Sequence, residues 1–220
     1  QFESKVISTS VCWNVLVVPT YAGRDDFTLE KAKMMNEFGY SGFAVDMYGD
    51  GKVGSSPEEN MELMQVILDD REMLQRRINL AHQTAINKVG VDAKNSAAIG
   101  FCFGGLCVLD LARSGSEISG VVSFHGLFNA PENLKDYKIT SKILALHGND
   151  DPMVPHQDVN GLANELTKAN ADWQIHAYGN TSHAFTNPLA SSPEDGMAFN
   201  ENSNNRSFTA MRNFLEEIFS

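Results

Sequence analysis

Residues 96–105 constrain the fold of this chain more than any other part of it. They read Ser-Ala-Ala-Ile-Gly-Phe-Cys-Phe-Gly-Gly, an apolar run that stops at a Gly-x-Cys-x-Gly-Gly turn before a helix-compatible segment. This pattern predicts a nucleophile elbow, in which a sharp turn between strand and helix presents a reactive side chain. Gly100 and Gly104 suit positions crowded by backbone, and Gly105 lets the helix start close to the strand. The helix N-terminus favours the thiolate form of Cys102.

An elbow nucleophile works with an acid and then a histidine, in that chain order. Asp151 follows the apolar run at 141–147, and His183 follows the run at 173–178. Taken singly, each residue has a more ordinary interpretation: a buried small cysteine, an aspartate that caps a helix, a solvated loop histidine. Together, and each just after a predicted strand, Cys102, Asp151 and His183 predict a catalytic triad at the face where open α/β sheets bind ligands.

Short buried strands alternate with amphipathic helices, which predicts an α/β fold with a mostly parallel central sheet between helices. The expected strands are residues 14–19, 42–46, 96–100, 120–124, 142–147 and 173–178. The expected helices are residues 28–38 with Thr28 as N-cap, 57–89 with a broken or irregular start, 103–113, 158–169 and 207–219. Residues 191–207 are expected to form a surface loop. The length of 220 residues predicts one domain, residues 1–220.

These motifs resemble those of the dienelactone hydrolase family of α/β-hydrolases. The resemblance rests on GFCFGG at 100–105, HGNDDPMVP at 147–155 and SHAF at 182–185, and it extends to VVPTYAG at 17–23 and FGYSGFAVDMYG at 38–49. By motif position it places the family's catalytic residues on Cys102, Asp151 and His183, with Asp150 as the alternative acid. It implies an α/β-hydrolase fold, a three-layer sandwich, and hydrolysis of an ester or lactone through a thioacyl intermediate without metal or cofactor.

Two positions depart from the family pattern. Thr20 stands where members often have a glutamate that can contact the resting cysteine. Asn187 stands where the archetype has an arginine that helps to hold the substrate carboxylate. We therefore expect the catalytic machinery to carry over and the dienelactone specificity to be absent, with a small neutral ester or lactone as the substrate.

Ester hydrolysis also needs backbone N–H groups that stabilise the oxyanion. Phe103, the residue after the nucleophile, should supply one, and the loop at 19–23 should supply the other through Tyr21. On spacing alone this loop is equally compatible with an ordinary glycine turn, and the family resemblance favours the oxyanion role. The side chains expected to bind substrate are His125, Phe128, Met153, Phe185 and Asn187, with residues 51–68 as a candidate cover, although such apolar residues more often belong to a core.

The composition of the chain excludes several classes of binding partner. The net charge of −11 argues against nucleic acid and anionic membrane surfaces, and no apolar run reaches the roughly 20 residues of a membrane helix. Three cysteines without framework spacing predict free thiols in a reducing, cytoplasmic setting. The local group His147, Asp150, Asp151 and His156 lacks regular ligand spacing, so no metal site is expected.

Two other classes of function stay open. A redox-sensing protein would pair Cys102 with Cys107, although five residues across a turn and helix is poor disulfide geometry. A catalytically silent domain that binds small molecules would keep the fold and lose the triad, and this chain retains all three residue types.

Overall fold

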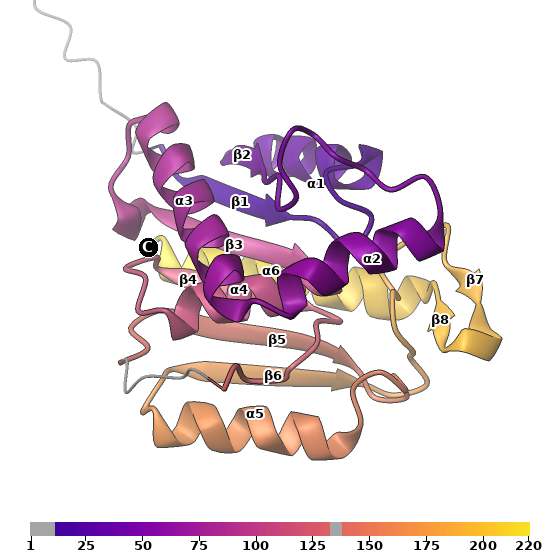
Figure 1. The fold of residues 1–220 in the computed structure, drawn as a ribbon. Helices are drawn as coiled ribbons and strands as arrows, with labels where there is room; N and C mark the ends of the chain where they lie inside the picture. The colour runs from indigo at the N-terminus through magenta and orange to yellow at the C-terminus, as the bar shows by residue number, and fades with distance from the viewer. Residues whose placement is uncertain (1–11, 133–137) are drawn as a thin grey trace, which may run out of the picture.

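A six-stranded parallel sheet lies between two layers of helices in the computed structural model, which describes residues 12–132 and 138–220 (Figure 1). The strand order is β2-β1-β3-β4-β5-β6, and every neighbouring pair is parallel. The strands are β1 (Asn14–Val18), β2 (Ser41–Ala44), β3 (Ser96–Phe101), β4 (Gly120–Phe124), β5 (Lys142–Gly148) and β6 (Trp173–Tyr178). The α/β-hydrolase fold expected from the sequence is confirmed.

The helices divide between the two faces of the sheet. One face carries α2 (Pro57–Leu68), α3 (Arg71–Val89), α4 (Phe103–Arg113) and α5 (His156–Lys168), and the other carries α1 (Asp26–Glu37) and α6 (Glu201–Ile218). Each face packs its own apolar cluster, so β1, β3 and β4 are buried along their whole length. Burial on both faces explains why these strands are continuous apolar runs in the sequence rather than alternating ones.

Several helix boundaries differ from the sequence-based prediction. The helix expected over 57–89 is two helices, because Asp70 breaks the run and caps α3 by accepting a hydrogen bond from the Met73 amide. The prediction of Thr28 as N-cap was wrong. Asp25 caps α1 and accepts from the Thr28 amide, so the helix begins earlier, at Asp26.

The prediction of a surface loop over residues 191–207 was also wrong in the second half of that range. A small hairpin of β7 (Ser191–Ser192) and β8 (Met197–Ala198) comes first, and α6 then begins at Glu201. Asn200 caps this helix, and Ser203 in its first turn is buried with its hydroxyl 2.7 Å from that of Thr181. A helix that buries serines in its first turns lacks the apolar period by which sequence analysis finds a helix start.

The parallel arrangement gathers the functional loops. Because all six strands run in one direction, the loops that follow them emerge at the same edge of the sheet. Within the described part of the chain, no helix combines the length and the apolar character needed to cross a bilayer.

Candidate active site

The turn between β3 and α4 is strained at Cys102. Its φ of 55° and ψ of −116° lie outside the regions that non-glycine residues ordinarily occupy. The flanking glycines are required, because a Cβ on Gly100 would collide with the Gly104 backbone and a Cβ on Gly104 would collide with the carbonyl groups of Val18 and Pro19. The structure thus confirms the sharp strand-to-helix turn and the reason for its glycines.

Asp151 and His183 form a buried pair beside this turn. His183 Nδ1 lies 2.7 Å from Asp151 Oδ2, and both side chains are almost fully buried. Asp151 Oδ1 accepts from the Met153 amide at 2.9 Å, which fixes the carboxylate plane. Asp150, the alternative acid, is exposed at the surface. It is therefore Asp151, and not Asp150, that contacts the histidine.

The hairpin β7–β8 fixes the position of His183. The His183 amide donates to the Gly196 carbonyl at 2.9 Å, and the Ala198 amide donates to the His183 carbonyl at 3.2 Å. With Nδ1 on Asp151, the other ring nitrogen, Nε2, is buried and lacks a well-formed hydrogen bond to any described residue. The second nitrogen is thus left for the thiol.

Cys102 and His183 shift each other's pKa. Cys102 keeps some exposure to the cavity, but close burial still opposes ionisation of its thiol. The His183 charge and hydrogen bonding from His183 and from the amides of Phe103 and Tyr21 outweigh burial and lower the pKa of Cys102. Burial likewise opposes protonation of His183, yet the Cys102 charge and the Asp151 carboxylate raise the pKa of His183. The arrangement favours a thiolate beside an imidazolium.

Although the Nε2–thiol contact falls short of good hydrogen-bond geometry, such contacts are often long before substrate binds.

The two amides that reach Cys102 are those expected from the sequence, Phe103 from the start of α4 and Tyr21 from the loop after β1. Thr20, at the position of the family glutamate, turns its hydroxyl to the local backbone and accepts from the Ala22 amide at 3.2 Å.

A cavity of about 230 Å³ opens above the thiol. Its walls come from the loops after β1, β3, β4 and β6, from the first turn of α1 and from the hairpin β7–β8. None of the described residues that line it is Asp, Glu, Lys or Arg; they are Thr20, Tyr21, Phe27, Cys102, His125, His183, Ala184, Asn187, Leu189, Ala190, Ser191, Ser192 and Met197. A larger groove beside α5 lies away from Cys102 and contains none of the three triad candidates.

The expected substrate-binding residues divide into two groups. His125 and Asn187 line the cavity, and Phe185 is fully buried behind it, with its ring 5.2 Å from that of His125. Phe128 and Met153 do not line it, and the expectation was wrong for both. Residues 51–68 contribute none of the described lining residues either; α2 packs its buried side chains, Met64 and Ile67, into the core.

The two wrong placements have local causes. The Phe128 carbonyl accepts from Arg113 Nη2 at 3.0 Å, which draws this loop toward the far end of α4 and sets the Phe128 ring against His147. After Asp151 the chain makes a turn in which the Val154 amide donates to the Asp151 carbonyl at 3.3 Å. This turn buries Val154 and leaves Met153 41% exposed.

Sequence reasoning missed two features of the site: the side of the cavity formed at the hairpin β7–β8, and Thr186. Leu189 and Met197 carry no motif, and they reach the cavity only because the hairpin folds beside His183. Thr186 is buried with its hydroxyl 2.8 Å from His125 Nε2. The one available signal was its position within the stretch that follows His183.

Comparison with known proteins gives consistent matches. The sequence model of the dienelactone hydrolase family matches residues 6–219. An uncharacterized protein of Caenorhabditis elegans is 34% identical over 132 residues, which cover 59% of this chain and 84% of that protein. A carboxymethylenebutenolidase homolog of Homo sapiens is 27% identical over 117 residues, which cover 53% of this chain and 44% of that protein.

Solved structures extend the similarity to almost the whole chain. A dienelactone hydrolase-like promiscuous phosphotriesterase from metagenomic libraries superposes with a TM-score of 0.89 and 34% identity. The superposition covers 96% of this chain and 88% of that one.

Proposed function

Because this chain belongs to the dienelactone hydrolase family, we propose that it hydrolyses esters or lactones with Cys102 as nucleophile, His183 as base and acid, and Asp151 as the group that orients His183. One observation carries this proposal: the buried Asp151–His183 pair directs its second nitrogen at a thiol whose pKa is lowered in spite of burial. Perturbed pKa values of this kind cluster at functional sites.

The reaction follows from the positions of these groups. The Cys102 thiolate attacks the ester carbonyl, and the resulting oxyanion accepts hydrogen bonds from the Tyr21 and Phe103 amides. The imidazolium of His183 protonates the departing alkoxide, which leaves a thioacyl group on Cys102. Neutral His183 then takes a proton from water, and the hydroxide attacks the thioacyl carbonyl to release the acid and regenerate the thiolate.

The cavity favours uncharged substrates. Its described lining residues carry no formal charge apart from the reacting pair, and Asn187 offers an amide where a guanidinium would grip a carboxylate. Arg24 and Arg71 are the arginines that could have supplied such a charge from another loop. Neither lines the cavity, and Arg71 is bound to Asp110. We propose a small neutral ester or lactone as the substrate, and a reducing, cytoplasmic setting for three free thiols.

A second candidate activity is hydrolysis of neutral phosphotriesters. The dienelactone hydrolase-like phosphotriesterase is 34% identical to this chain. A phosphotriester is neutral, so it suits a cavity whose described lining residues include no Asp, Glu, Lys or Arg. The thiolate would attack phosphorus in place of carbon and displace an alkoxide, which His183 protonates, while the same two amides hold the oxygen on phosphorus. Water activated by His183 would then break the S–P bond, release the phosphodiester and regenerate the thiolate.

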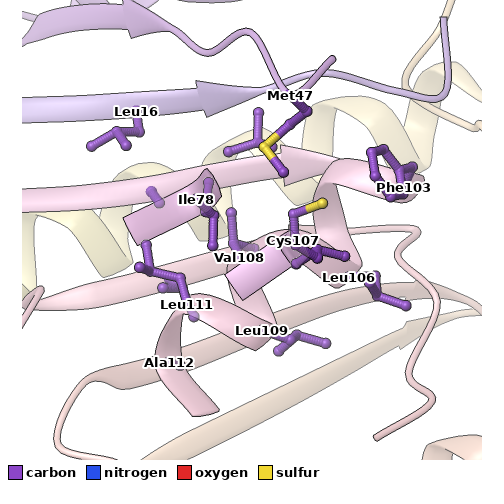
Figure 2. Close-up of a cluster of buried hydrophobic side chains, with 14 of the residues drawn as sticks. Leu16, Met47, Ile78, Phe103, Leu106, Cys107, Val108, Leu109, Leu111 and Ala112 are labelled. Carbon is purple, nitrogen blue, oxygen red and sulfur yellow. The ribbon is translucent and has the colours of Figure 1, made fainter. Parts of the chain in front are cut away.

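A thiol-exchange function has less support. Cys107, the required partner thiol, is fully buried in the core cluster among Met47, Leu106 and Val108 (Figure 2). Burial and the nearby Asp110 carboxylate raise the pKa of Cys107 well above its ordinary value. A buried, protonated thiol is a poor partner in disulfide exchange.

A panel of small neutral esters, lactones and a phosphotriester, assayed before and after alkylation with iodoacetamide, tests the proposal. We expect ester or lactone turnover that disappears when Cys102 is alkylated. Turnover that survives complete alkylation of Cys102 would assign the chemistry to another group. Turnover of none of the substrates would instead favour binding or sensing.

A further inference from the structure

We propose that Tyr48, in the loop after β2, is a positioning residue that holds both halves of the oxyanion hole. The inference rests on the proposed function. The Tyr48 hydroxyl donates to the Tyr21 carbonyl at 2.8 Å. Its ring stacks on that of Phe103, with centroids 6.1 Å apart and planes 16° apart. One side chain thus contacts the two residues whose amides reach the thiol.

The Tyr48 hydroxyl reaches this loop from outside, at Tyr21 itself. Within the loop, the Ala22 and Gly23 amides both return to Thr20, which closes a small turn but does not anchor it to the sheet. From outside the turn, the Tyr48 hydroxyl holds the Tyr21 carbonyl. The next two carbonyls accept weaker bonds of 3.4 Å, Ala22 from the Gly54 amide and Gly23 from the Thr28 hydroxyl. At Gly23, with a φ of +89°, an added Cβ would lie 3.2 Å from the Tyr48 ring and 2.6 Å from the Lys52 carbonyl oxygen. The loop therefore rests directly on Tyr48.

Tyr48 is itself held rigidly. The Asp46 carboxylate accepts hydrogen bonds from the amides of Tyr48, Gly49 and Gly51 at 3.1, 2.8 and 2.8 Å. From α3, Arg77 Nη1 donates to the Met47 and Tyr48 carbonyls at 2.7 and 2.8 Å. Side chains whose own position is fixed in this way can hold a reacting group to a fraction of an ångström.

The chemical state of Tyr48 suits this task. Burial raises the pKa of Tyr48, and the charge of the nearby Cys102 thiolate raises it further. The hydroxyl therefore keeps its proton and remains a hydrogen-bond donor across the working pH range. A loop held by a permanent donor keeps the Tyr21 amide directed at the sulfur, and later at the oxyanion that forms beside it.

The variant Tyr48→Phe tests this inference, because it keeps the ring on Phe103 and removes the hydroxyl. Its matched control is Tyr40→Phe, which removes a hydroxyl near Phe219, just before β2 and so at the opposite end of the strands. The first measurement is the rate of Cys102 alkylation by iodoacetamide against pH, which requires no substrate turnover. The second is kcat and KM on a neutral ester turned over by the wild type.

The sign of the pH effect follows from the lowered pKa of Cys102. In the wild type, the thiolate should persist below the ordinary cysteine pKa of about 8.5, and alkylation should slow only as pH falls through the lowered value. In Tyr48→Phe the loosened Tyr21 amide should stabilise the thiolate less, so the alkylation midpoint should move to higher pH. We expect kcat to fall about ten- to a hundred-fold with little change in KM. Tyr40→Phe should change neither quantity.

An unchanged alkylation midpoint and an unchanged kcat in a folded Tyr48→Phe protein would overturn the inference. A fall in thermal stability with both quantities unchanged would do the same, since it would show a purely structural role. If Tyr48→Phe does not fold, Arg77→Met, which releases the Tyr48 carbonyl, must raise the midpoint by a smaller amount, and no change there would refute the inference. If the wild type turns over no ester, the proposed function fails, while the alkylation midpoints still decide the role of Tyr48.

Discussion

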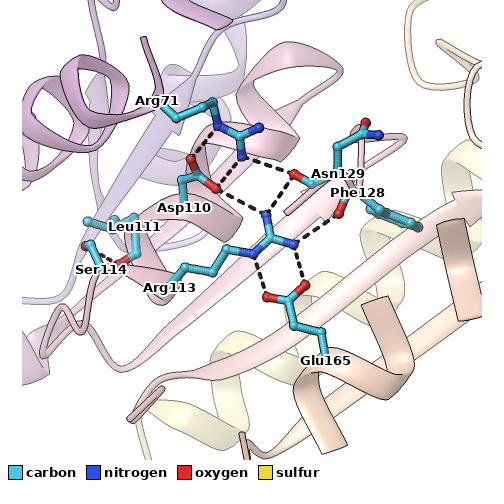
Figure 3. A network of polar contacts seen from close by, with 8 residues as sticks. All are labelled: Arg71, Asp110, Leu111, Arg113, Ser114, Phe128, Asn129 and Glu165. Carbon is cyan, nitrogen blue, oxygen red and sulfur yellow. Dashed lines mark hydrogen bonds and ion pairs between the residues drawn. The ribbon is translucent and has the colours of Figure 1, made fainter. Parts of the chain in front are cut away.

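The polar groups at the two ends of helix α4 differ in how completely they are paired. At its N-terminus, Cys102 has a strained backbone and a thiol directed toward a histidine nitrogen without a well-formed hydrogen bond. In its last turns, Asp110 and Arg113 are buried charges with several partners each (Figure 3). Arg71 meets Asp110 with two hydrogen bonds of 2.8 and 2.7 Å, and Arg113 meets Glu165 with two of 2.8 Å.

This difference in pairing indicates a structural role for the C-terminal end of α4 and a chemical role for its N-terminal end. In the network every carboxylate oxygen accepts a guanidinium N–H. The carbonyls of Asn129 and Phe128 accept further hydrogen bonds from the two arginines. Charges that are fully paired in this way hold elements together but have no capacity left for chemistry. At the elbow the polar groups are only partly satisfied, which keeps them available for a substrate. One short helix thus carries a rigid end and a reactive end.

Removing the thiol should produce the largest effect. Cys102→Ala should lower ester turnover by at least about 10⁴-fold, because without the nucleophile only binding and the oxyanion amides remain. The unfolding temperature should change little, because alanine keeps the strained backbone and the variant loses only the contacts of the thiol with His183 and the two amides. Stopped assays and thermal unfolding measure the two quantities.

Cys12→Ala and Cys107→Ala serve as controls for this variant and should retain turnover. Wild-type rates in Cys102→Ala would contradict the proposed mechanism.

The neighbouring aspartates distinguish position from charge. Asp151→Asn should slow turnover about 10³- to 10⁴-fold, because the amide no longer fixes the tautomer of His183. Asp150→Asn removes the same charge one residue away, at an exposed site, and should change turnover by no more than a few-fold. Steady-state kinetics on one neutral ester compares them, and the reverse order would transfer the role to Asp150.

Breaking the network should reduce stability and leave chemistry intact. Asp110→Asn leaves Arg71 and Arg113 short of a charged partner and should lower the free energy of unfolding by about 3–5 kcal/mol. For a chain of this size each kcal/mol corresponds to roughly 2–4 °C in unfolding temperature. The turnover of the folded fraction at low temperature should stay within a few-fold of the wild type.

Arg76→Ala is the matched control, because Arg76 forms only exposed ion pairs, with Asp70 at 3.9 Å and Glu72 at 3.8 Å. Such pairs contribute little, so its unfolding temperature should hardly change. Loss of turnover in folded Asp110→Asn, with stability unchanged, would remove the contrast between the two ends of α4.

The smallest expected effect concerns substrate charge. The wild type should prefer a neutral short-chain ester to a dienelactone with a carboxylate, and Asn187→Arg should shift the preference toward the anion. A charge-assisted contact contributes about 1.5–3 kcal/mol, or roughly ten- to a hundred-fold in affinity. The ratio of kcat/KM for the two substrates measures this, and a clear wild-type preference for the dienelactone would show that another residue binds the carboxylate.

The elbow could be predicted from sequence because its cause is local. A strained residue between a strand and a helix needs glycine on both sides, and three glycines in six residues, 100–105, record that need. The proximity of Asp151 and His183 could also be predicted, since parallel strands bring their C-terminal ends to one edge. Short-range sterics and sheet topology were sufficient for these features.

The remaining features depend on contacts between distant segments. Whether Phe128 faces the cavity depends on Arg113, and Arg113 is buried only because Glu165 comes from another helix. A visible clue was Asp110 and Arg113 at helical i, i+3 spacing in an otherwise apolar helix. That spacing predicts a buried pair, but it does not identify Arg71 as the third member.

The dependence of the thiol on His183 has a consequence during synthesis. Burial alone raises the pKa of Cys102, and the histidine that reverses this effect belongs to a loop made much later than the elbow. A chain in which the elbow has formed but the loop after β6 has not would therefore lack the His183 contribution that lowers the pKa of this thiol. Full reactivity of Cys102 therefore requires that the loop after β6 and the hairpin β7–β8 have folded beside the elbow.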